Sequence, residues 1–321
     1  MKSTVVIPNY NGIEFLKACL DSLYKCEPSD FEIIIVDNGS KDGSIELIER
    51  EYPEVRLIGF EENTGFARAV NAGIEASQTE FVILLNNDTV VDTKFVTELE
   101  KAMDDSEKIF SASAKMVDLH NPNILDVTGD YYCALGWAYA YGKGKNVSSC
   151  TKKRRVFSAC GGAAIYRRDV LVKLGSFDDN HFAYLEDIDV GYRARINGYH
   201  NVYVPEAIVY HAGSGSSGSR YNEFKIKLSS RNSTYLVMKN MPFIQLLLNL
   251  PLLIVGFGIK AFFFALKGYG RIYISGLING IKLYYSDAGR ERRGKFRFKN
   301  LGNYLVIQLE LWVNVFRRLW A

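Results

Sequence analysis

The first hundred residues alternate short apolar runs with segments that carry apolar residues at helical spacing, and this alternation constrains the fold most. Apolar runs bounded by polar residues are typical of strands buried on both faces of a parallel sheet. The alternation predicts an open α/β fold, with a mostly parallel sheet and helices on both faces. The expected strands are Ser3–Ile7, Phe31–Val36, Val55–Gly59 and Phe81–Leu85, and the expected helices are Ile13–Tyr24, Ser44–Glu51, Phe66–Ala76 and Thr93–Met103.

The following residues depart from this alternation and are richer in β-forming residues. Acidic residues begin the one clear helix in this part, and a Gly/Ser-rich run, GSGSSGS, follows the last strand. The expected elements are β-rich residues 107–170, a turn and helix over Phe182–Arg195, and two short strands, Val202–Val204 and Ala207–Tyr210, that lead to His211.

Polar motifs follow each of the four predicted parallel strands: PNYNG, DNGSKDG, EENTGFARAVN and NNDT. The carboxyl ends of such strands meet at one edge of the sheet, where open α/β sheets bind their ligands. Two interpretations of Asp37 stay open. Its carboxylate either forms an Asx turn, which the Asn-Gly pair favours, or accepts hydrogen bonds from a ribose or a base.

The strand Phe81–Leu85 ends in Asn86, Asn87 and Asp88. A role for Asp88 as a helix cap is open, but the next helix has its own candidate caps in the residues just before it. An exposed carboxylate at this edge is a natural ligand for a hard divalent cation that carries a diphosphate. Only Asp88 of the three can supply charge, so a second metal ligand has to come from elsewhere.

His211 is the candidate second ligand. A lone histidine after a strand more often has a structural role, but the Gly/Ser run behind it could close over a bound ligand. Imidazole is compatible with Mn²⁺ and tolerable for Mg²⁺.

Glu186, Asp187 and Asp189 place three acids within four residues at a predicted helix start. Negative charge is favourable at a helix N-terminus, which accounts for Asp189 and also suits Glu186. Three acids exceed what capping needs, and a carboxylate among other acids has a raised pKa, as suits a general base. Asp187 is therefore the predicted base.

The motifs PNYNG, DNGSKDG, ENTGFARAVN, LLNNDT, GGAAIYRRDVL, LEDIDVGYR and VYHAGSGSSG, in this order over residues 1–240, resemble those of the family 2 glycosyltransferases with a GT-A fold. The resemblance is strongest to the bacterial branch with rhamnosyltransferases of cell-surface polysaccharides. It implies a Rossmann-like GT-A domain and inverting transfer of a sugar from a nucleotide-sugar donor, with Mg²⁺ or Mn²⁺ as the cofactor.

The resemblance also implies roles for residues that match the family's motifs. dTDP-rhamnose is the donor that this branch suggests, while UDP-hexoses and UDP-N-acetylhexosamines stay open; the acceptor is a saccharide or a lipid-linked saccharide. The implied residues are Pro8, Asp37, Asn63, Arg68, Asn71 and Asn87 for the donor, Asp88 and His211 for the metal, Asp187 for catalysis, and Glu186, Gly161, Gly162 and Trp137 on the acceptor side.

Residues 241–321 differ from the rest in charge. They hold 12 Lys and Arg against 3 Asp and Glu, a net charge of +9, whereas residues 1–240 hold the other 27 and 33, a net charge of −6. A basic, aromatic-rich tail should meet an anionic partner. We expect a boundary near Lys239–Pro242 and no nucleic-acid partner.

The uncharged stretch Asn240–Ile259 is about as long as a membrane span. A crossing would place the later cluster of six Lys and Arg over residues 290–299 outside, against the positive-inside tendency. We therefore expect helices that lie in the cytoplasmic face of the cell membrane or re-enter it, with the amphipathic stretch Tyr304–Trp320 among them. A buried helical subdomain or an oligomer contact is the alternative.

Other classes fit the sequence less well. A dehydrogenase would need G-x-G-x-x-G after the first strand, and a nucleotidyltransferase a Gly-rich, Arg-containing loop; PNYNG is neither. The start MKSTVVIPNYN has no signal-peptide pattern, and five cysteines without paired spacing fit a reducing compartment. A non-catalytic, nucleotide-binding membrane adaptor stays open.

Overall fold

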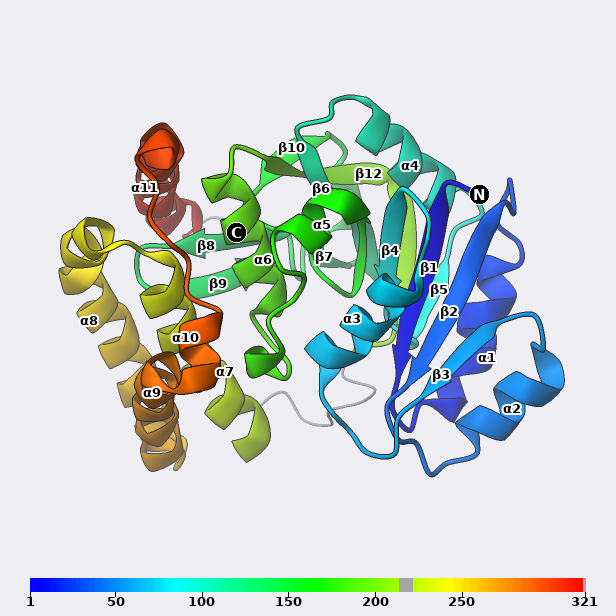
Figure 1. Cartoon of the computed structure of the whole chain (residues 1–321), viewed down its shortest axis with the longest axis horizontal. Coiled ribbons are helices and arrows are strands. Elements are labelled where there is room, and N and C mark those ends of the chain that lie inside the picture. Colours follow the sequence, from blue (N-terminus) through cyan, green and yellow to red (C-terminus); the bar gives the residue numbers. More distant parts are fainter. Residues whose placement is uncertain (214–221, 320–321) are drawn as a thin grey trace.

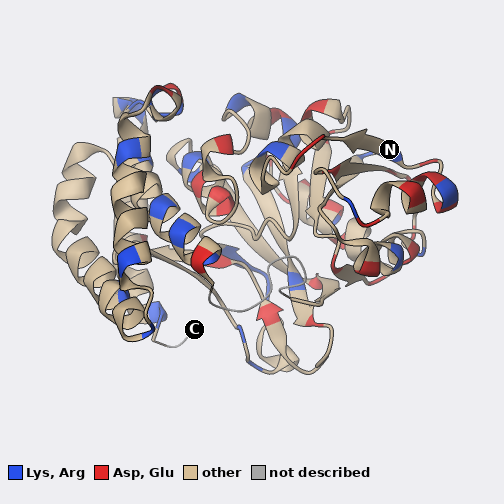
Figure 2. Ribbon diagram, turned by 90° about the horizontal axis from the view of Figure 1, so that it is seen from below, with Lys and Arg blue, Asp and Glu red and all other residues tan. Residues whose placement is uncertain are grey.

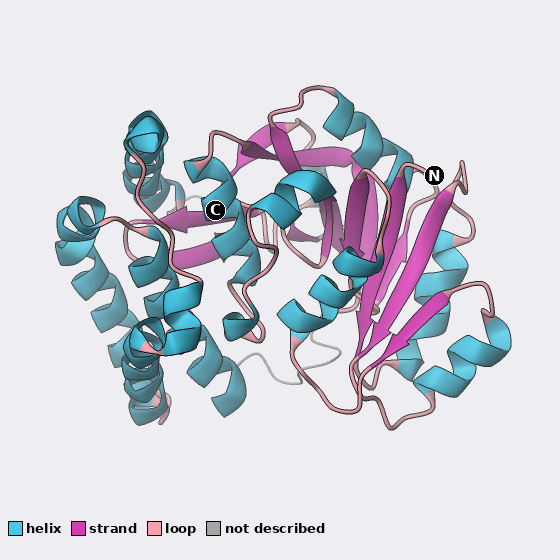
Figure 3. Cartoon of the chain, in the orientation of Figure 1, coloured by secondary structure: helices cyan, strands magenta, loops and turns pink. Residues whose placement is uncertain are grey.

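The computed structural model describes residues 1–213 and 222–319, and its centre is a ten-stranded mixed sheet with helices on both faces (Figures 1 and 3). A separate two-stranded hairpin, β8–β9, lies beside it. The strands are β1 (Ser3–Asn9), β2 (Phe31–Asp37), β3 (Arg56–Gly59), β4 (Phe81–Leu85), β5 (Thr89–Val91), β6 (Ile109–Asp118), β7 (Leu125–Val127), β8 (Asp130–Cys133), β9 (Trp137–Ala140), β10 (Arg154–Val156), β11 (Ala163–Arg167) and β12 (His200–His211).

The helices follow the predicted alternation in the first part of the chain and then dominate its C-terminal part. The α-helices are α1 (Ile13–Leu23), α2 (Ser44–Glu51), α3 (Phe66–Ala76), α4 (Phe95–Asp104), α5 (Arg168–Lys173), α6 (Glu186–Ile196), α7 (Glu223–Asn240), α8 (Phe243–Leu266), α9 (Gly270–Tyr285), α10 (Asp287–Glu291) and α11 (Leu301–Arg317). Short 3₁₀ turns are η1 (Val147–Ser149), η2 (Asp179–His181) and η3 (Phe298–Asn300).

The parallel half of the sheet has the order β3-β2-β1-β4. The apolar runs of β1, β2 and β4 are largely buried on both faces, as predicted, whereas the edge strand β3 is half-buried or exposed along its length. In β4, Phe81 and Ile83 contribute to the core on the side of α1, α2 and α4, while Val82 and Leu84 contribute to the core on the side of α3 and α5. Alternate side chains of a strand point to opposite faces, so a strand covered on both faces has to be apolar throughout.

The other half of the sheet is mixed. β11 lies antiparallel between β4 and β6, and β12 runs parallel to β6. The predicted pair of strands over Val202–Val204 and Ala207–Tyr210 is wrong, because β12 is one continuous strand. Its register against β6 shifts between Val204 and Ile208, at Pro205, which has no N–H for the ladder and is accommodated by this bulge.

The C-terminal helices pack against the body on one side. Gly276 and Gly280 of α9 lie close to α7, where a Cβ on Gly276 would come within 1.8 Å of Ser230 Oγ. α11 contacts β8 through Asn314, whose Nδ2 donates to the carbonyl oxygen of Tyr132 at 2.8 Å. Figure 2 shows mainly blue Lys and Arg segments on these helices, in agreement with their basic composition.

α8 is the one helix among the described residues that is long and apolar enough to cross a membrane, by length and composition, with 17% of its most apolar window buried. Its buried residues, Gln245, Asn249, Leu253 and Gly256, follow one another at helical spacing and face the body. The predicted amphipathic stretch Tyr304–Trp320 corresponds to α11, with Trp320 outside the described residues. The Gly/Ser run also lies largely outside them.

Candidate active site

A cavity of about 740 Å³ opens at the carboxyl ends of β1 and β4. The loop before α6, the hairpin strand β9 and the helices α7 and α8 complete its walls. Nine of the residues that the sequence assigned to the site line this cavity: Pro8, Asn63, Asn87, Asp88, Gly161, Gly162, Glu186, Asp187 and His211.

Asp88 and His211 lie beside each other because β5 and β12 pair antiparallel, which sets His211 opposite Thr89. The Ala212 N–H also donates to the Asp88 carbonyl oxygen at 2.9 Å. Asp88 Oδ1 is 3.3 Å from His211 Nε2. Two residues 123 positions apart are thus joined at the edge of the sheet.

Asp88 is not the exposed carboxylate that the sequence predicted. Its side chain is 6% exposed and lies beside His211. A buried carboxylate needs a cationic partner, and His211 lies close enough to serve as one.

Asp126 of β7 holds the other nitrogen of His211, with its Oδ2 2.7 Å from Nδ1. Burial by itself lowers the pKa of His211, but the hydrogen bonds to Asp126 and Asp88 outweigh it and raise this pKa to about 9. Burial raises the pKa of Asp126, but its bonds to His211 and Lys143 lower it to about 2.

The pair Asp88–His211 fits a divalent cation chemically. A carboxylate oxygen and an imidazole nitrogen suit Mn²⁺ well and Mg²⁺ less well. A carboxylate on the second nitrogen of a ligating histidine fixes the ring and its tautomer, and Asp126 occupies that place. Two protein ligands leave positions free for substrate oxygens and water, which is the usual arrangement for a metal that carries phosphates.

Asp187 lies half-buried in the first turn of α6. The Ile188 N–H donates to its Oδ1 at 2.7 Å, and the Gly161 N–H to its Oδ2 at 3.3 Å. Burial raises the pKa of Asp187 above its ordinary value, and the two N–H donors oppose this rise by stabilising the ionised form.

Two further acids, Asp130 and Glu186, lie near Asp187, together with the thiol of Cys160. Asp130, at the start of β8, and Cys160 each offer an atom within 4.8 Å of one in Asp187. Burial, followed by the charge of Asp187, raises the pKa of Asp130 and of Glu186 well above their ordinary values. Glu186 Oε2 has no hydrogen-bond partner among the described residues. Because Asp187 alone among the three accepts two backbone N–H bonds with its side chain, the negative charge of the cluster is best held on Asp187.

The loop before α6 holds Asp187 through an unusual backbone. Phe182, Tyr184 and Leu185 have φ of 62°, 71° and 71°. Residues with a side chain pay about 1–2 kcal/mol each for this left-handed conformation. Such a loop persists only when its surroundings hold it in place.

The completely buried Asn232 of α7 supplies that support. Its Nδ2 lies 2.9, 2.9 and 2.7 Å from the carbonyl oxygens of His181, Ala183 and Tyr184. The neighbouring Arg231 donates to the carbonyl oxygens of Asn180 and His181. α7 thus fixes the loop that presents the acidic cluster.

Asparagine side chains link the strand ends on the opposite wall. Asn87 Nδ2 donates to Asn9 Oδ1 at 2.6 Å, and Asn9 Nδ2 donates to Asp37 Oδ2 at 2.8 Å. This chain joins the ends of β4, β1 and β2. Next to it, Asn38 Nδ2 donates to Asn63 Oδ1 at 3.1 Å.

Four predicted site residues do not line the cavity. Asp37 is buried and accepts from the Ser40 N–H at 2.8 Å, so it forms the turn that was one of its two interpretations. Arg68 is exposed on α3. The side-chain amide of Asn71 accepts from the Phe177 N–H and donates to the Phe177 carbonyl oxygen. Trp137 Nε1 donates to the Gly256 carbonyl oxygen of α8 at 3.0 Å, which attaches the tail to the body.

Comparison with known proteins assigns the chain to a family. The sequence profile described as Glycosyl transferase family 2 matches residues 4–175, more than half of the chain. The chain belongs to this family. This glycosyltransferase is therefore an enzyme, and the adaptor alternative is set aside.

Among curated relatives, an N-acetylglucosaminyl-diphospho-decaprenol L-rhamnosyltransferase of Mycobacterium tuberculosis is 27% identical over 239 residues, which cover 67% of this glycosyltransferase and 77% of the relative.

Two solved structures share the GT-A fold. S. aureus TarS 1-349 in complex with UDP-GlcNAc matches with a TM-score of 0.61 and 16% identity, over 96% of this chain and 90% of that one. The mannosyltransferase PcManGT of Pyrobaculum calidifontis, in complex with GDP-Man and Mn²⁺, matches with a TM-score of 0.54 and 16% identity, over 96% and 87%. The predicted GT-A fold is confirmed.

Proposed function

We propose that this glycosyltransferase transfers a sugar, with inversion, from a nucleotide-sugar donor to a saccharide or lipid-linked saccharide of a cell-surface polysaccharide. The observation that carries the proposal is that the Asp88–His211 pair and Asp187 line one cavity. The name of the Mycobacterium relative favours rhamnose as the sugar and dTDP-rhamnose as the donor. The UDP-GlcNAc bound to TarS keeps UDP-sugars as the second candidate.

Asp88 and His211 would hold the divalent cation, Mg²⁺ or Mn²⁺, and Asp126 would orient His211. When bound, such a cation neutralises the charge that develops on a leaving diphosphate. Pro8, Asn63 and Asn87 line the same cavity and would contact the donor. Asp37 would act indirectly, by fixing Asn9.

Asp187 would accept the proton of the acceptor hydroxyl as its oxygen attacks the anomeric carbon. One bond forms, between the acceptor oxygen and the anomeric carbon, and one breaks, between that carbon and the diphosphate oxygen. A single displacement inverts the anomeric centre. The raised pKa of Asp187 makes it a stronger base than an ordinary aspartate.

We further propose that residues 241–321 attach the enzyme to the cytoplasmic face of the membrane. α8 keeps one face on the body over most of its length, and Lys260 of the same helix lines the active-site cavity. A helix held along a folded body in this way is suited to lie in the interface or re-enter it rather than cross. Its exposed face carries large apolar side chains, among them Phe243, Leu247 and Ile254.

The test measures donor binding and turnover with purified enzyme. dTDP-rhamnose and UDP-sugars are screened by thermal shift with and without Mn²⁺ or Mg²⁺, and the stabilising donor is then assayed with lipid-linked acceptors. Asp187→Asn should abolish turnover and leave donor binding intact. Asp169→Asn, a similar acid in the first turn of α5 and outside the cavity, should leave both unchanged. Full turnover by Asp187→Asn would remove Asp187 as the base.

A further inference from the structure

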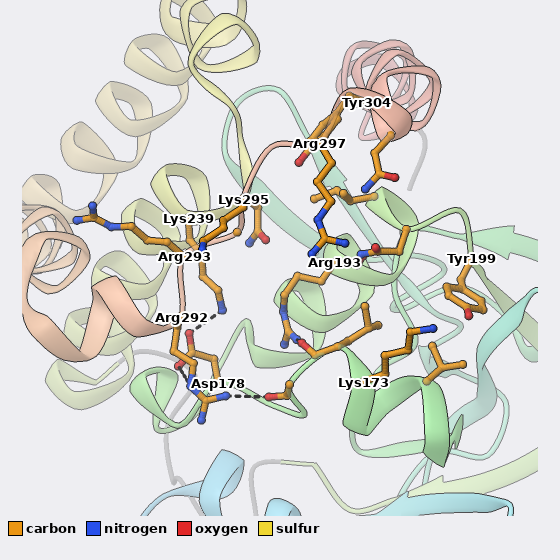
Figure 4. A pocket seen from close by; sticks show the side chains of 18 of the residues that line it. Lys173, Asp178, Arg193, Tyr199, Lys239, Arg292, Arg293, Lys295, Arg297 and Tyr304 are labelled. Atoms are coloured by element: carbon orange, nitrogen blue, oxygen red, sulfur yellow. Dashed lines mark hydrogen bonds and ion pairs between the residues drawn. The ribbon is translucent and has the colours of Figure 1, made fainter.

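A second cavity, of about 760 Å³, lies between the catalytic body and the segment that joins α10 to α11 (Figure 4). Its walls include the C-terminal ends of α6 and α7, whereas the active-site cavity lies toward the N-terminal ends of these helices. The two cavities are therefore separate sites.

Positive charge dominates the second cavity. Two acidic side chains, Asp178 and Glu291, face eight cationic ones, for a formal net charge of +6. The cationic residues are Lys173, Arg193, Lys239, Arg292, Arg293, Lys295, Arg297 and Lys299.

Half of these cations are paired with protein groups. Lys239 is 1% exposed, and its Nζ is 2.6 Å from Asp178 Oδ2 and 2.9 Å from Asp189 Oδ2. Arg193 also pairs with Asp189, at 2.8 Å. Arg292 ties the segment after α10 to the body by donating to the Gly175 carbonyl oxygen at 2.8 Å.

The other cations have no such partner. The side chains of Lys173, Lys295, Arg297 and Lys299 make no hydrogen bond or ion pair with residues 1–213 or 222–319. Figure 4 shows Arg297 extending toward Arg193, although the two charges repel each other. A bound anion would convert this repulsion into attraction.

Asn240 gives an independent indication of a ligand. It lines the cavity at 3% exposure, and its Nδ2 donates to Asp189 Oδ1 at 2.8 Å, which fixes the orientation of the amide. Its Oδ1 is buried and has no donor among the described residues. A ligand that carries a hydroxyl next to an anionic group would satisfy both this oxygen and the free cations.

The rim of the cavity adds apolar side chains to the positive charge. Residues 295–299 read KFRFK, so that cations alternate with Phe296 and Phe298, which are 43% and 84% exposed. α11 begins directly after this segment and exposes Leu301 and Leu305. Aromatic and aliphatic side chains beside lysine and arginine are typical of surfaces that meet anionic lipid.

From these contacts we infer that the second cavity binds the phosphate headgroup of an anionic membrane phospholipid. Lys173, Lys295, Arg297 and Lys299 donate to the phosphate oxygens, and Asn240 accepts from a headgroup hydroxyl. Arginine and lysine form strong charge-assisted hydrogen bonds with phosphate. This inference rests on the membrane association proposed above and adds a specific site to it.

The test is co-sedimentation of the full chain with vesicles of phosphatidylcholine alone and of phosphatidylcholine with phosphatidylglycerol. The double variant Arg297→Gln/Lys299→Gln should bind the anionic vesicles at least about 30-fold more weakly, because each cation loses a charge-assisted hydrogen bond to phosphate in addition to the roughly fivefold contribution of a cation near an anionic surface. The matched control is Arg271→Gln/Lys282→Gln, which removes the same charge from exposed positions of α9, outside the cavity. The control should lose much less, and unchanged far-UV circular dichroism verifies that both variants fold.

Equal losses in the two double variants would overturn the inference, because they would mean that only the general charge of the tail matters. Wild-type binding to neither kind of vesicle would refute the membrane association itself. A second arm measures thermal stabilisation by glycerol 1-phosphate. Stabilisation that the cavity variant loses while its vesicle binding stays normal would assign the site to a soluble phosphate compound, and would overturn the lipid assignment.

Discussion

Replacement of Asn232 by alanine tests whether α7 positions the catalytic acid. The amide has two hydrogens, which it shares among three carbonyl oxygens of the loop before Asp187. A buried hydrogen bond contributes about 0.5–1.5 kcal/mol net, so the two N–H groups together contribute about 1–3 kcal/mol. The loop has three residues at positive φ that are held against their preference, and it should relax once this support is lost.

We expect Asn232→Ala to lower the free energy of unfolding by about 1–3 kcal/mol. We also expect kcat to fall about 100-fold, the cost of a misplacement of about 1 Å at a catalytic group. Urea unfolding, donor affinity and steady-state kinetics measure the three effects, and donor affinity should change least.

Two variants of the same helix serve as controls. Asn232→Asp keeps the oxygen that accepts from Arg231 but turns a second acceptor toward the loop carbonyl oxygens, so it should lose at least as much stability and kcat as Asn232→Ala. Thr234→Ala removes a buried hydroxyl that bonds only to its own helix and a methyl group close to Gly280 of α9, so it should lose some stability but keep the wild-type kcat. A stable Asn232→Ala enzyme with normal kcat would refute the claim that this amide positions the loop.

Three further predictions concern acidic side chains and the residues that pair with them. Asp126→Asn should weaken Mn²⁺ binding about 10–100-fold, measured by calorimetry, because His211 loses the carboxylate that orients it; unchanged affinity would contradict that role. The kcat of the wild type should fall as the pH is lowered through the raised pKa of Asp187, because the base must be ionised. The fall should begin above the usual aspartate pKa of about 4. A kcat that stays constant down to that pH would count against Asp187 as the base. Lys239→Met should lower the free energy of unfolding, measured in urea, by about 3–5 kcal/mol, since Asp178 and Asp189 lose a buried cation. A loss below about 1 kcal/mol would show that Arg193 alone is sufficient to neutralise these buried acids.

The sequence predicted the parallel half of the fold well because that half obeys local rules. The boundaries of α3 and β4 agree with the predicted ones, since apolar periodicity alone defines them. The pairing of Asp88 with His211 was also predicted, because Asp88 follows β4 and His211 lies at the end of β12. Asp126 and Asp130 were missed. They belong to short antiparallel elements, for which no strand-end rule applies, and the only signal was the run DVTGD, with two acids around a turn.

The polar residues of α8 show a second limit. Gln245 and Asn249 interrupt an apolar segment, and their role depends on partners far along the chain. Gln245 accepts from the Tyr192 hydroxyl at 2.9 Å, and Asn249 exchanges hydrogen bonds with Gln308 of α11. No periodicity within α8 could have predicted a contact with a helix about 60 residues later.

The attachment of α8 to the active-site wall has a geometric consequence. Lys260 lines the cavity and the Trp137 side chain donates to the Gly256 carbonyl oxygen, so direct contacts join α8 to the walls of the cavity that holds Asp187. An enzyme that rests on a bilayer through α8 would then hold Asp187 at a constant height above the lipid. Such an enzyme would select its acceptor by length, because only a glycan whose terminal hydroxyl reaches that height could be extended. The reach of the acceptor, as well as its chemistry, would then decide which sugar chain receives the next residue.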